Sequence, residues 1–320
     1  MSMLPVRLAH QLEDAPASRR WLVEGLWAEA AVGIVGGEPK CCKSFLALDL
    51  AVAVASGAPC LRRYAVARPG PVLLYAAEDA LHVVRERLAG IAEVSRLDLQ
   101  RLPIHVITAP SVRLDVERDR NALYETVATI KPRLLVLDPF VRLHRIDENL
   151  AGEVAPLLAY LRELQRQLDT AVLLVHHARK GGHVRAGQAL RGSSELHAWG
   201  DSNLYLRRDR DKLWLTVEHR AAPSVPALAL ALAAHGTAVA LHVVDTLPAT
   251  ATDPPEVTPA DRIVGALAAA PTPLSRRALR DACRMRNTAL GSVLADLLAA
   301  GRVIEHDRGY LLAPAATDSR

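Results

Sequence analysis

Short apolar runs alternate with longer segments of helical period over the first 200 residues. The runs cover 31–37 (AVGIVGG), 71–77 (PVLLYAA), 134–137 (LLVL) and 171–175 (AVLLV). Continuous apolar runs are typical of strands buried on both faces, and strands that alternate with helices pair in parallel. The pattern therefore predicts an α/β domain whose mainly parallel sheet is covered by helices on both faces.

The rhythm changes beyond about residue 203. Residues 203–220 (NLYLRRDRDKLWLTVEHR) form two β-like runs around a charged RDRDK turn, which predicts an antiparallel hairpin appended to the sheet. A proline-rich stretch over 246–259 (TLPATATDPPEVTP) predicts a stiff, extended connection between domains.

Three helical segments and a hairpin are expected after this connection. They are 260–269, SRRALRDACR from Ser275, NTALGSVLADLLAAG from Asn287, and two short strands in VIEHDRGYLL. This order resembles a winged helix-turn-helix. The predicted organisation is a large α/β domain over 1–245, a linker over 246–259, a winged-helix domain over 260–313 and a tail over 314–320.

Composition narrows the class of protein. Of 320 residues, 50% are hydrophobic and 23% are charged, which excludes bulk disorder. A formal net charge of +4 over this length is too dilute to indicate nucleic acid by itself. Four cysteines do not make a secreted disulfide framework, and no apolar run suits a signal sequence or a membrane span. We expect a cytoplasmic protein with no membrane association.

A phosphate-binding loop follows the first strand. Residues 37–44 (GEPKCCKS) fit G-x-x-x-x-G-K-[ST] except that Cys42 replaces the second glycine. In such a loop, backbone N–H groups cradle phosphate oxygens, the lysine reaches the β and γ phosphates, and the serine binds Mg²⁺. We therefore predict binding of ATP and Mg²⁺. The residues assigned to nucleotide binding are Gly37, Glu38, Pro39, Lys40, Cys41, Cys42, Lys43, Ser44 and Phe45.

Cys42 leaves two interpretations open. Its Cβ could crowd the phosphates and leave a decayed, empty loop. In a working loop, Cys42 must adopt a backbone conformation that a non-glycine residue tolerates, with its sulfur turned away from the phosphates. Because the thiol would then lie at a helix N-terminus beside Lys43, we expect its pKa to be lowered.

Polar side chains follow three further strands of the predicted sheet. Asp138 ends LLVLD and suits a Mg²⁺ site together with Ser44, while Glu78 follows PVLLYAA and suits a general base. His176 and His177 end a third strand. Because the carboxyl ends of parallel strands meet at one edge, these side chains and Lys43 predict a phosphoryl-transfer site.

The order and spacing of these motifs resemble one family. WLVEGL, GGEPKCCKSFLALDLAVAVASG, LLYAAED, LLVLDPF, DEN at 147–149, LLVHHARKGG and LRGSSEL are similar to the RecA-like P-loop ATPases of the RepA type, hexameric replicative helicases of plasmids and mobile elements related to DnaB. The resemblance runs from about Trp21 to Pro223. It implies an ATP hydrolase that acts on DNA as a homo-oligomeric ring and takes part in DNA replication with partner proteins.

The resemblance also assigns residue roles. Glu78 would be the catalytic glutamate, Asp138 the Walker B acid and His177 the sensor, with His176 as the alternative. RepA-type proteins carry their arginine finger where this chain has Asp201, whereas DnaB-type proteins carry Lys-x-Arg where this chain has Glu218-His219-Arg220. Arg220 is therefore the candidate finger, and an ordinary surface arginine is the alternative.

Two basic segments are candidates for DNA contact. The segment 179–191 (RKGGHVRAGQALR) has four positive charges and no acid, which suits the backbone of single-stranded DNA, and a solvated loop is the alternative. Residues 276–286 hold five arginines and one acid, which suits DNA backbone contact or a docking surface for protein. The residues assigned to DNA binding are Arg179, Lys180, Arg185, Arg191, Arg276 and Arg277.

Three functions follow from these observations. The leading hypothesis is an ATP-dependent DNA motor or loader. The second is a DNA-binding regulator that uses nucleotide as a switch without motor activity, and the third is a docking protein with an inactive phosphate loop.

Overall fold

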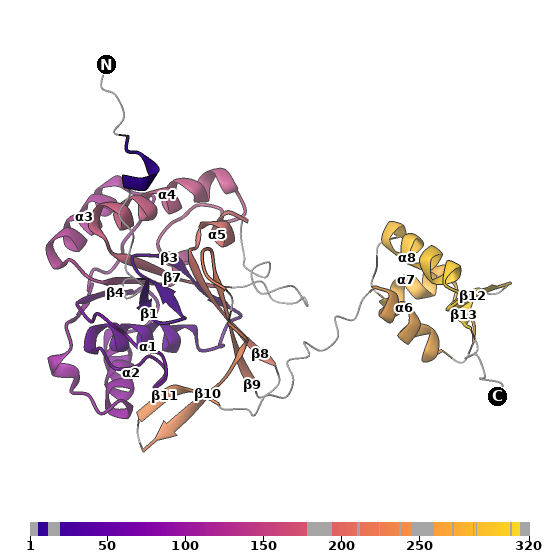
Figure 1. Cartoon of the computed structure of the whole chain (residues 1–320), viewed down its shortest axis with the longest axis horizontal. Coiled ribbons are helices and arrows are strands. Elements are labelled where there is room, and N and C mark those ends of the chain that lie inside the picture. The colour runs from indigo at the N-terminus through magenta and orange to yellow at the C-terminus, as the bar shows by residue number, and fades with distance from the viewer. Residues whose placement is uncertain are drawn as a thin grey trace. The chain divides into compact units, whose positions relative to one another are not determined.

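The chain divides into two compact units, Met1–Thr246 and Leu247–Arg320 (Figure 1). The computed structural model describes residues 6–11, 20–177, 194–244 and 259–313, apart from positions 210, 211, 224, 237, 271, 284, 286 and 308. The predicted linker over 246–259 lies almost wholly outside these residues. Each unit is treated separately below.

A nine-stranded sheet forms the centre of the first unit. Its strand order is β11-β10-β9-β8-β3-β7-β6-β4-β5. The strands from β8 to β5 in this order are parallel, and β9, β10 and β11 are added antiparallel. The strands are β3 Val32–Gly37, β4 Val72–Ala76, β5 Ile104–Val106, β6 Leu134–Asp138, β7 Ala171–His177, β8 Ser202–Asp209, β9 Lys212–His219, β10 Leu228–His235 and β11 Ala238–Val243.

Helices cover both faces of this sheet (Figure 1). Two buried clusters of hydrophobic side chains, one on each face, fill the space between the sheet and its helices. The helices on one face are α1 Lys43–Ser56 and α2 Leu81–Val94, and those on the other are α3 Glu117–Ile130, α4 Ala151–Leu168 and α5 Ser194–Trp199. Short 3-10 turns lie at Ala9–Gln11, Leu99–Arg101 and Phe140–Arg142, and a small β1–β2 ribbon spans Trp21–Val23 and Trp27–Ala28.

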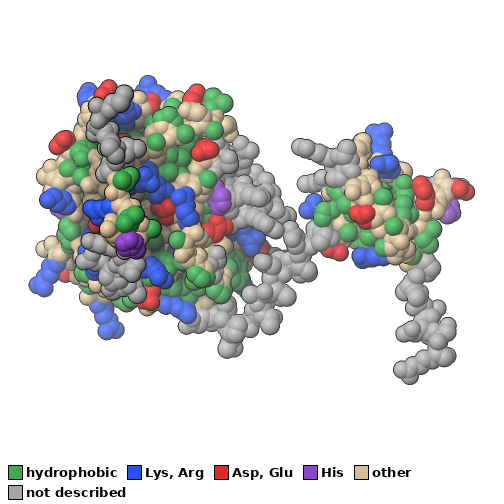
Figure 2. All heavy atoms as spheres, turned by 45° about the horizontal axis from the view of Figure 1, so that its top comes forward, with side chains coloured by type: hydrophobic (Ala, Val, Ile, Leu, Met, Phe, Trp, Pro, Cys, Tyr) green, Lys and Arg blue, Asp and Glu red, His purple; other side chains and the backbone are tan. Residues whose placement is uncertain are grey.

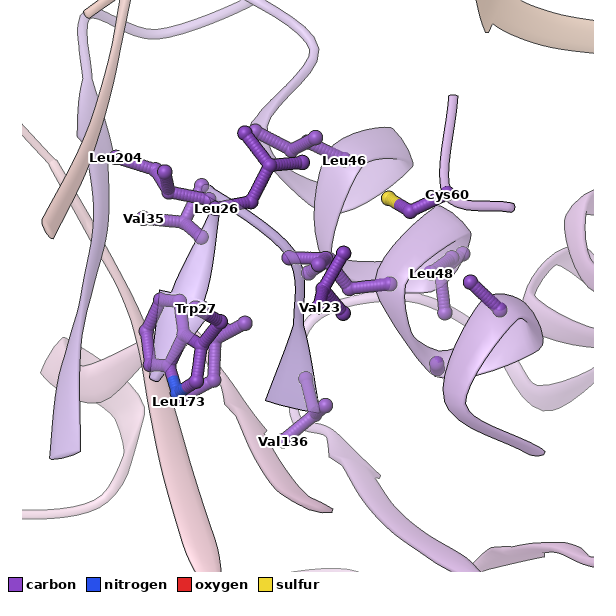
Figure 3. Packing of buried hydrophobic residues seen from close by; sticks show 14 of the residues in the cluster. Val23, Leu26, Trp27, Val35, Leu46, Leu48, Cys60, Val136, Leu173 and Leu204 are labelled. Carbon is purple, nitrogen blue, oxygen red and sulfur yellow. The ribbon is translucent and has the colours of Figure 1, made fainter. Parts of the chain in front are cut away.

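Alternation along β8 shows how the strands divide their side chains between the two faces. Leu204 and Leu206 belong to the cluster that contains the α1 side chains, whereas Tyr205 belongs to the cluster under α3 and α4. Figure 3 shows part of the first cluster, to which Trp27, Leu46 and Leu204 contribute from distant segments of the chain. This packing fixes the position of the loop between β3 and α1.

Gly33 is required by the close approach of two strands. A Cβ at this position would lie 1.7 Å from the carbonyl oxygen of Ser202 and 3.0 Å from the Trp27 ring. The Trp27 indole is fully buried and donates from Nε1 to the Ala31 carbonyl at 3.3 Å. The absence of a side chain at Gly33 therefore lets β8 pair beside β3.

The structure confirms the strands predicted from the apolar runs and the antiparallel hairpin, formed by β8 and β9. It adds β5, a three-residue edge strand, and the β10–β11 hairpin, neither of which was predicted. The β10–β11 sequences LALALAAH and AVALHV carry mainly leucine and alanine, so their composition favours a helix and not a strand.

The second unit contains the three predicted helices and the predicted hairpin. They are α6 Pro259–Ala268, α7 Arg276–Cys283, α8 Asn287–Ala299, β12 Val303–His306 and β13 Gly309–Leu312. A separate buried cluster that includes Ile263, Leu279 and Leu294 holds the helices together. Across the described residues of both units, no helix combines the length and apolar character needed to cross a membrane.

Candidate functional site

The phosphate loop lies between β3 and α1 at the carboxyl edge of the parallel strands. Gly37 ends β3 with His177 of β7 beside it on one side and Leu206 of β8 on the other. Its φ is 153°, and a Cβ there would lie 2.3 Å from the Leu206 carbonyl oxygen and 2.7 Å from Cys41 Sγ. The chain therefore needs glycine at the first position of the loop. The side chains of Glu38, Pro39 and Lys40 are exposed on its outer side.

Lys43 is the first residue of α1, and its side chain folds back under the loop. It is 5% exposed, and its Nζ donates a hydrogen bond to the Glu38 carbonyl at 2.7 Å and lies 3.8 Å from Cys41 Sγ. Burial lowers the pKa of Lys43, although Cys41, Asp138 and Glu78 act against this shift. A partly desolvated ammonium inside a loop of backbone N–H groups is suited to bind phosphate oxygens.

Ser44 and Asp138 are brought together from α1 and β6. The Ser44 hydroxyl lies beside the Asp138 carboxyl, and burial raises the pKa of Asp138 to about 6, with Asp79 and Glu78 adding to the effect of burial and Ser44 and Lys43 opposing it. Oxygen atoms from a hydroxyl and a carboxylate are ligands that Mg²⁺ prefers. A bound cation would also stabilise the ionised form of this buried carboxylate. These two residues would hold the cation in a nucleotide complex.

Two more carboxylates lie at the end of β4. The backbone N–H of Ala77 donates to the Asp138 carbonyl at 2.7 Å, so the ends of β4 and β6 are joined. Glu78 accepts a hydrogen bond from Arg142 Nε at 2.8 Å, and Asp79 pairs with Arg87. The Arg87 guanidinium carbon also lies 5.3 Å from the centre of the Phe45 ring. Glu78 is exposed at this end of β4, so its carboxylate is accessible to water.

His176 and His177 end β7, but their surroundings differ. His176 is 1% exposed, and its Nδ1 lies 3.9 Å from Glu148 Oε1, whereas His177 is half-buried at the sheet edge. His144 Nε2 lies 3.3 Å from the same Glu148 oxygen. The structure thus places His177 at the edge beside Gly37 and gives His176 a buried position among Glu148, His144 and the Phe140 ring.

Cys42 has φ 65° and ψ 24°, in the left-handed region that favours glycine. A side chain there costs about 1 kcal/mol of backbone strain. Its sulfur lies 3.8 Å from Nη2 of Arg208 in β8. The expectation of a lowered thiol pKa is wrong, because burial raises the pKa of Cys42 more than the nearby Arg208 and Lys43 lower it.

Arg220 lies at the opposite edge of the sheet from the phosphate loop of its own chain. Its Nη1 is 3.4 Å from Asp201 Oδ1, and its backbone N–H donates to the Asp201 carbonyl at 2.9 Å. Its Nη2 also donates to the carbonyl of Ala198 in α5. Asp201 in turn pairs with Arg162 and accepts from the Val32 N–H at 3.3 Å. An arginine at this edge cannot reach the nucleotide site of its own chain.

The residues assigned to DNA contact divide between two regions. Arg179, Lys180, Arg185 and Arg191 lie outside the described residues. Arg276 and Arg277 are exposed on the first turn of α7, and Arg276 lies across Gly291 of α8, where an added Cβ would be 2.6 Å from its Nη2.

A family model described as an AAA domain matches residues 2–183. The chain belongs to this AAA domain family. Among solved structures, one that is described as an ATPase domain is 14% identical with a TM-score of 0.51, covering 64% of this chain and 83% of that one. This likeness shows the fold, and the predicted α/β fold with a mainly parallel sheet is confirmed for the first unit.

Two further solved structures are similar over 64% of this chain. The RadB recombinase is 18% identical with a TM-score of 0.48 over 88% of its length. A DnaB-like replicative helicase, described with its primase interactions, is 14% identical with a TM-score of 0.49 over 56% of its length.

Three residues near the site were not found from the sequence. Arg142 and Arg208 each contact a predicted site residue, and Glu148 contacts His176. Glu148 was part of the quoted DEN segment, and Arg208 was part of the charged turn. Their sequence neighbourhood gives no signal of these partners, since the contacts depend on strand register and loop path.

Proposed function

We propose that this AAA domain protein hydrolyses MgATP and uses the energy to act on DNA, as a motor or loader similar to the RepA-type replicative helicases of plasmids, phages or mobile elements. The observation that carries the proposal is the convergence of Lys43, Ser44, Asp138 and Glu78 on one sheet edge, with Ser44 beside Asp138. A phosphate loop that binds no nucleotide would not be expected to keep these four side chains together.

Each residue has a distinct role in the proposed reaction. Lys43 binds the β and γ phosphates, and Ser44 and Asp138 hold Mg²⁺, which neutralises phosphate charge when bound. Glu78 accepts the proton of the attacking water once its carboxylate is free of Arg142. His177, beside Gly37, detects the terminal phosphate at the start of the segment 178–193.

DNA contact is proposed for two regions. Arg179, Lys180, Arg185 and Arg191 would hold the backbone of single-stranded DNA in a homo-oligomeric ring, in which Arg220 of each subunit would act on the site of its neighbour. The three helices and hairpin of the second unit are consistent with a winged helix, whose Arg276 and Arg277 would contact phosphates.

The hairpin of the second unit carries acidic side chains, in contrast to the arginines of α7. Glu305, His306 and Asp307 are exposed, and Figure 2 shows acidic and histidine side chains gathered at one end of this unit, apart from its basic side chains. DNA contact is therefore proposed for α7 and not for the hairpin, and a protein partner is the alternative for this unit.

The pairing of Arg220 with Asp201 favours a second candidate function. If Arg220 stays bound within its own subunit, the ring lacks its finger and hydrolysis is slow. Such a protein would be a DNA-binding regulator switched by nucleotide.

ATP turnover and nucleotide affinity measured with and without single-stranded DNA test these functions. A motor shows turnover stimulated by DNA, whereas a switch shows nucleotide binding with slow turnover that DNA leaves unchanged. Lys43→Ala should abolish binding or turnover, and Arg118→Ala, which removes an exposed charge from α3, should leave both unchanged. Wild-type protein that binds no nucleotide at millimolar concentration would refute both.

A further inference from the structure

The Cys42 side chain occupies a position that glycine fills in the phosphate-loop pattern. Its backbone is left-handed, at φ 65°, as the pattern requires of that glycine, so the loop has kept its path while gaining a Cβ and a sulfur atom. Rotation about Cα–Cβ offers the sulfur three staggered positions. Binding of phosphate in the cradle requires a position in which the sulfur points away from the loop's N–H groups.

The neighbouring strand β8 reaches this side chain. Leu206 pairs with Gly37, and β8 continues in the same direction to Asp209. Leu204 and Leu206 face the α1 side of the sheet, so alternation places Arg208 on that side and Arg207 on the opposite side. The loop also turns towards α1, which brings Arg208 Nη2 to 3.8 Å from Cys42 Sγ.

We propose that Arg208 is a positioning residue for the phosphate loop: its guanidinium holds the Cys42 sulfur on the β8 side, so that the side chain at the glycine position stays out of the phosphate cradle. The proposal rests on the nucleotide-binding function proposed above. Sulfur is a weak hydrogen-bond acceptor, but a charged donor such as a guanidinium strengthens the contact. The planar guanidinium also offers a flat surface against which the thiol can pack. Cys42 is half-buried and also packs against the hydrophobic cluster under α1, so the contact with Arg208 adds a polar restraint to this packing.

The test is a double-mutant cycle on Cys42 and Arg208. Affinity for a fluorescent ADP analogue with Mg²⁺ is measured in the full chain for wild type, Cys42→Gly, Arg208→Ala and the double variant. Arg208→Ala should weaken binding about fivefold to tenfold when Cys42 is present and less than about twofold when glycine replaces it. Arg207→Ala removes the same charge from the other face of the sheet, and it should leave the affinity unchanged both with Cys42 present and with Cys42→Gly. Arg208→Gln, which keeps most of the side-chain length, replaces Arg208→Ala if that variant does not fold.

Each other outcome overturns the inference. An equal loss in both backgrounds means that Arg208 acts on the nucleotide or the fold and not through Cys42, and no loss in either means that the contact has no role. Binding by Cys42→Gly but not by wild type means that Arg208 fails to keep the cradle open, while the proposed nucleotide site survives. Absence of binding in all four proteins refutes the proposed function as well.

Discussion

The Nε atom of Arg142 donates a hydrogen bond of 2.8 Å to Glu78 Oε1, joining the turn after β6 to the end of β4. Both side chains are substantially exposed, at 62% and 41%, so the contact exchanges readily with water. The carboxylate proposed to activate water is thus engaged by a cation in the turn after β6. Release of this contact would let Glu78 turn towards a bound nucleotide.

Glu78→Gln should keep MgATP affinity within about twofold and lower kcat by about 100-fold or more, because the amide cannot accept the proton. Single-turnover hydrolysis and equilibrium binding separate the two effects. Glu86→Gln, an exposed substitution on α2, is the matched control and should change neither. Loss of binding together with loss of folding would give Glu78 a structural role instead.

Arg220→Ala should retain nucleotide affinity but lose most turnover, by about 1000-fold for a finger supplied in trans. Mixing Arg220→Ala with Lys43→Ala should restore turnover, since the second variant supplies the arginine and the first an intact nucleotide site. The urea midpoint of each variant controls for the lost contact with Asp201. A mixture as inactive as its components would argue that Arg220 acts only within its own chain.

Cys42 should react slowly with iodoacetamide at pH 7 to 8. Burial raises its pKa, so the thiolate fraction is small there and the rate should still be increasing above pH 9. Saturating MgATP should protect the thiol. Mass spectrometry of the labelled peptide measures both effects, and equal rates with and without nucleotide would show that the loop does not hold it.

Glu148→Gln should lower the free energy of unfolding at pH 7 by about 1 to 3 kcal/mol. Burial acts to raise the pKa of Glu148, but the contact with His144 at 3.3 Å and the charges of His176, His144 and His177 outweigh it, and the net pKa is lowered. A lowered folded-state pKa gives stability that is present above the unfolded value of about 4.3 and is lost as pH falls through the folded value. Urea titrations from pH 7 to 3 should therefore show the two proteins converging in stability, and a constant difference would count against the ionic contact.

The double variant Arg276→Ala, Arg277→Ala should lower the slope of log affinity against log salt by about 1 to 2 for DNA binding by the full chain. Arg280 already pairs with Asp281 at 2.8 Å, so Arg280→Ala is the control and should have a smaller effect. An unchanged slope would favour protein docking for this unit.

The parallel core and the phosphate loop could be predicted because they are local patterns: apolar runs, a glycine, and a lysine-serine pair before a helix. The contact of Arg208 with Cys42 could not, since these residues are 166 positions apart and meet only because β8 pairs with β3 in one register. The same holds for Glu148, which lies in the loop before α4 and whose partner His176 is in β7. Composition favoured a helix for β10 and β11. They are strands because β10 extends the sheet from β9, and β11 pairs with β10 and packs on α2.

The pairing of β3 with β8 has a consequence for synthesis of the chain. The Ile34 N–H donates to Asn203 Oδ1 at 3.1 Å across 169 residues, and β7, on the other side of β3, is also made late. At about 5 to 20 residues per second, a ribosome needs about 10 to 30 s between these two residues. The phosphate loop therefore leaves the ribosome before β7 and β8, the two strands that pair with β3. A bound nucleotide can assist folding of this site only after β8 has emerged.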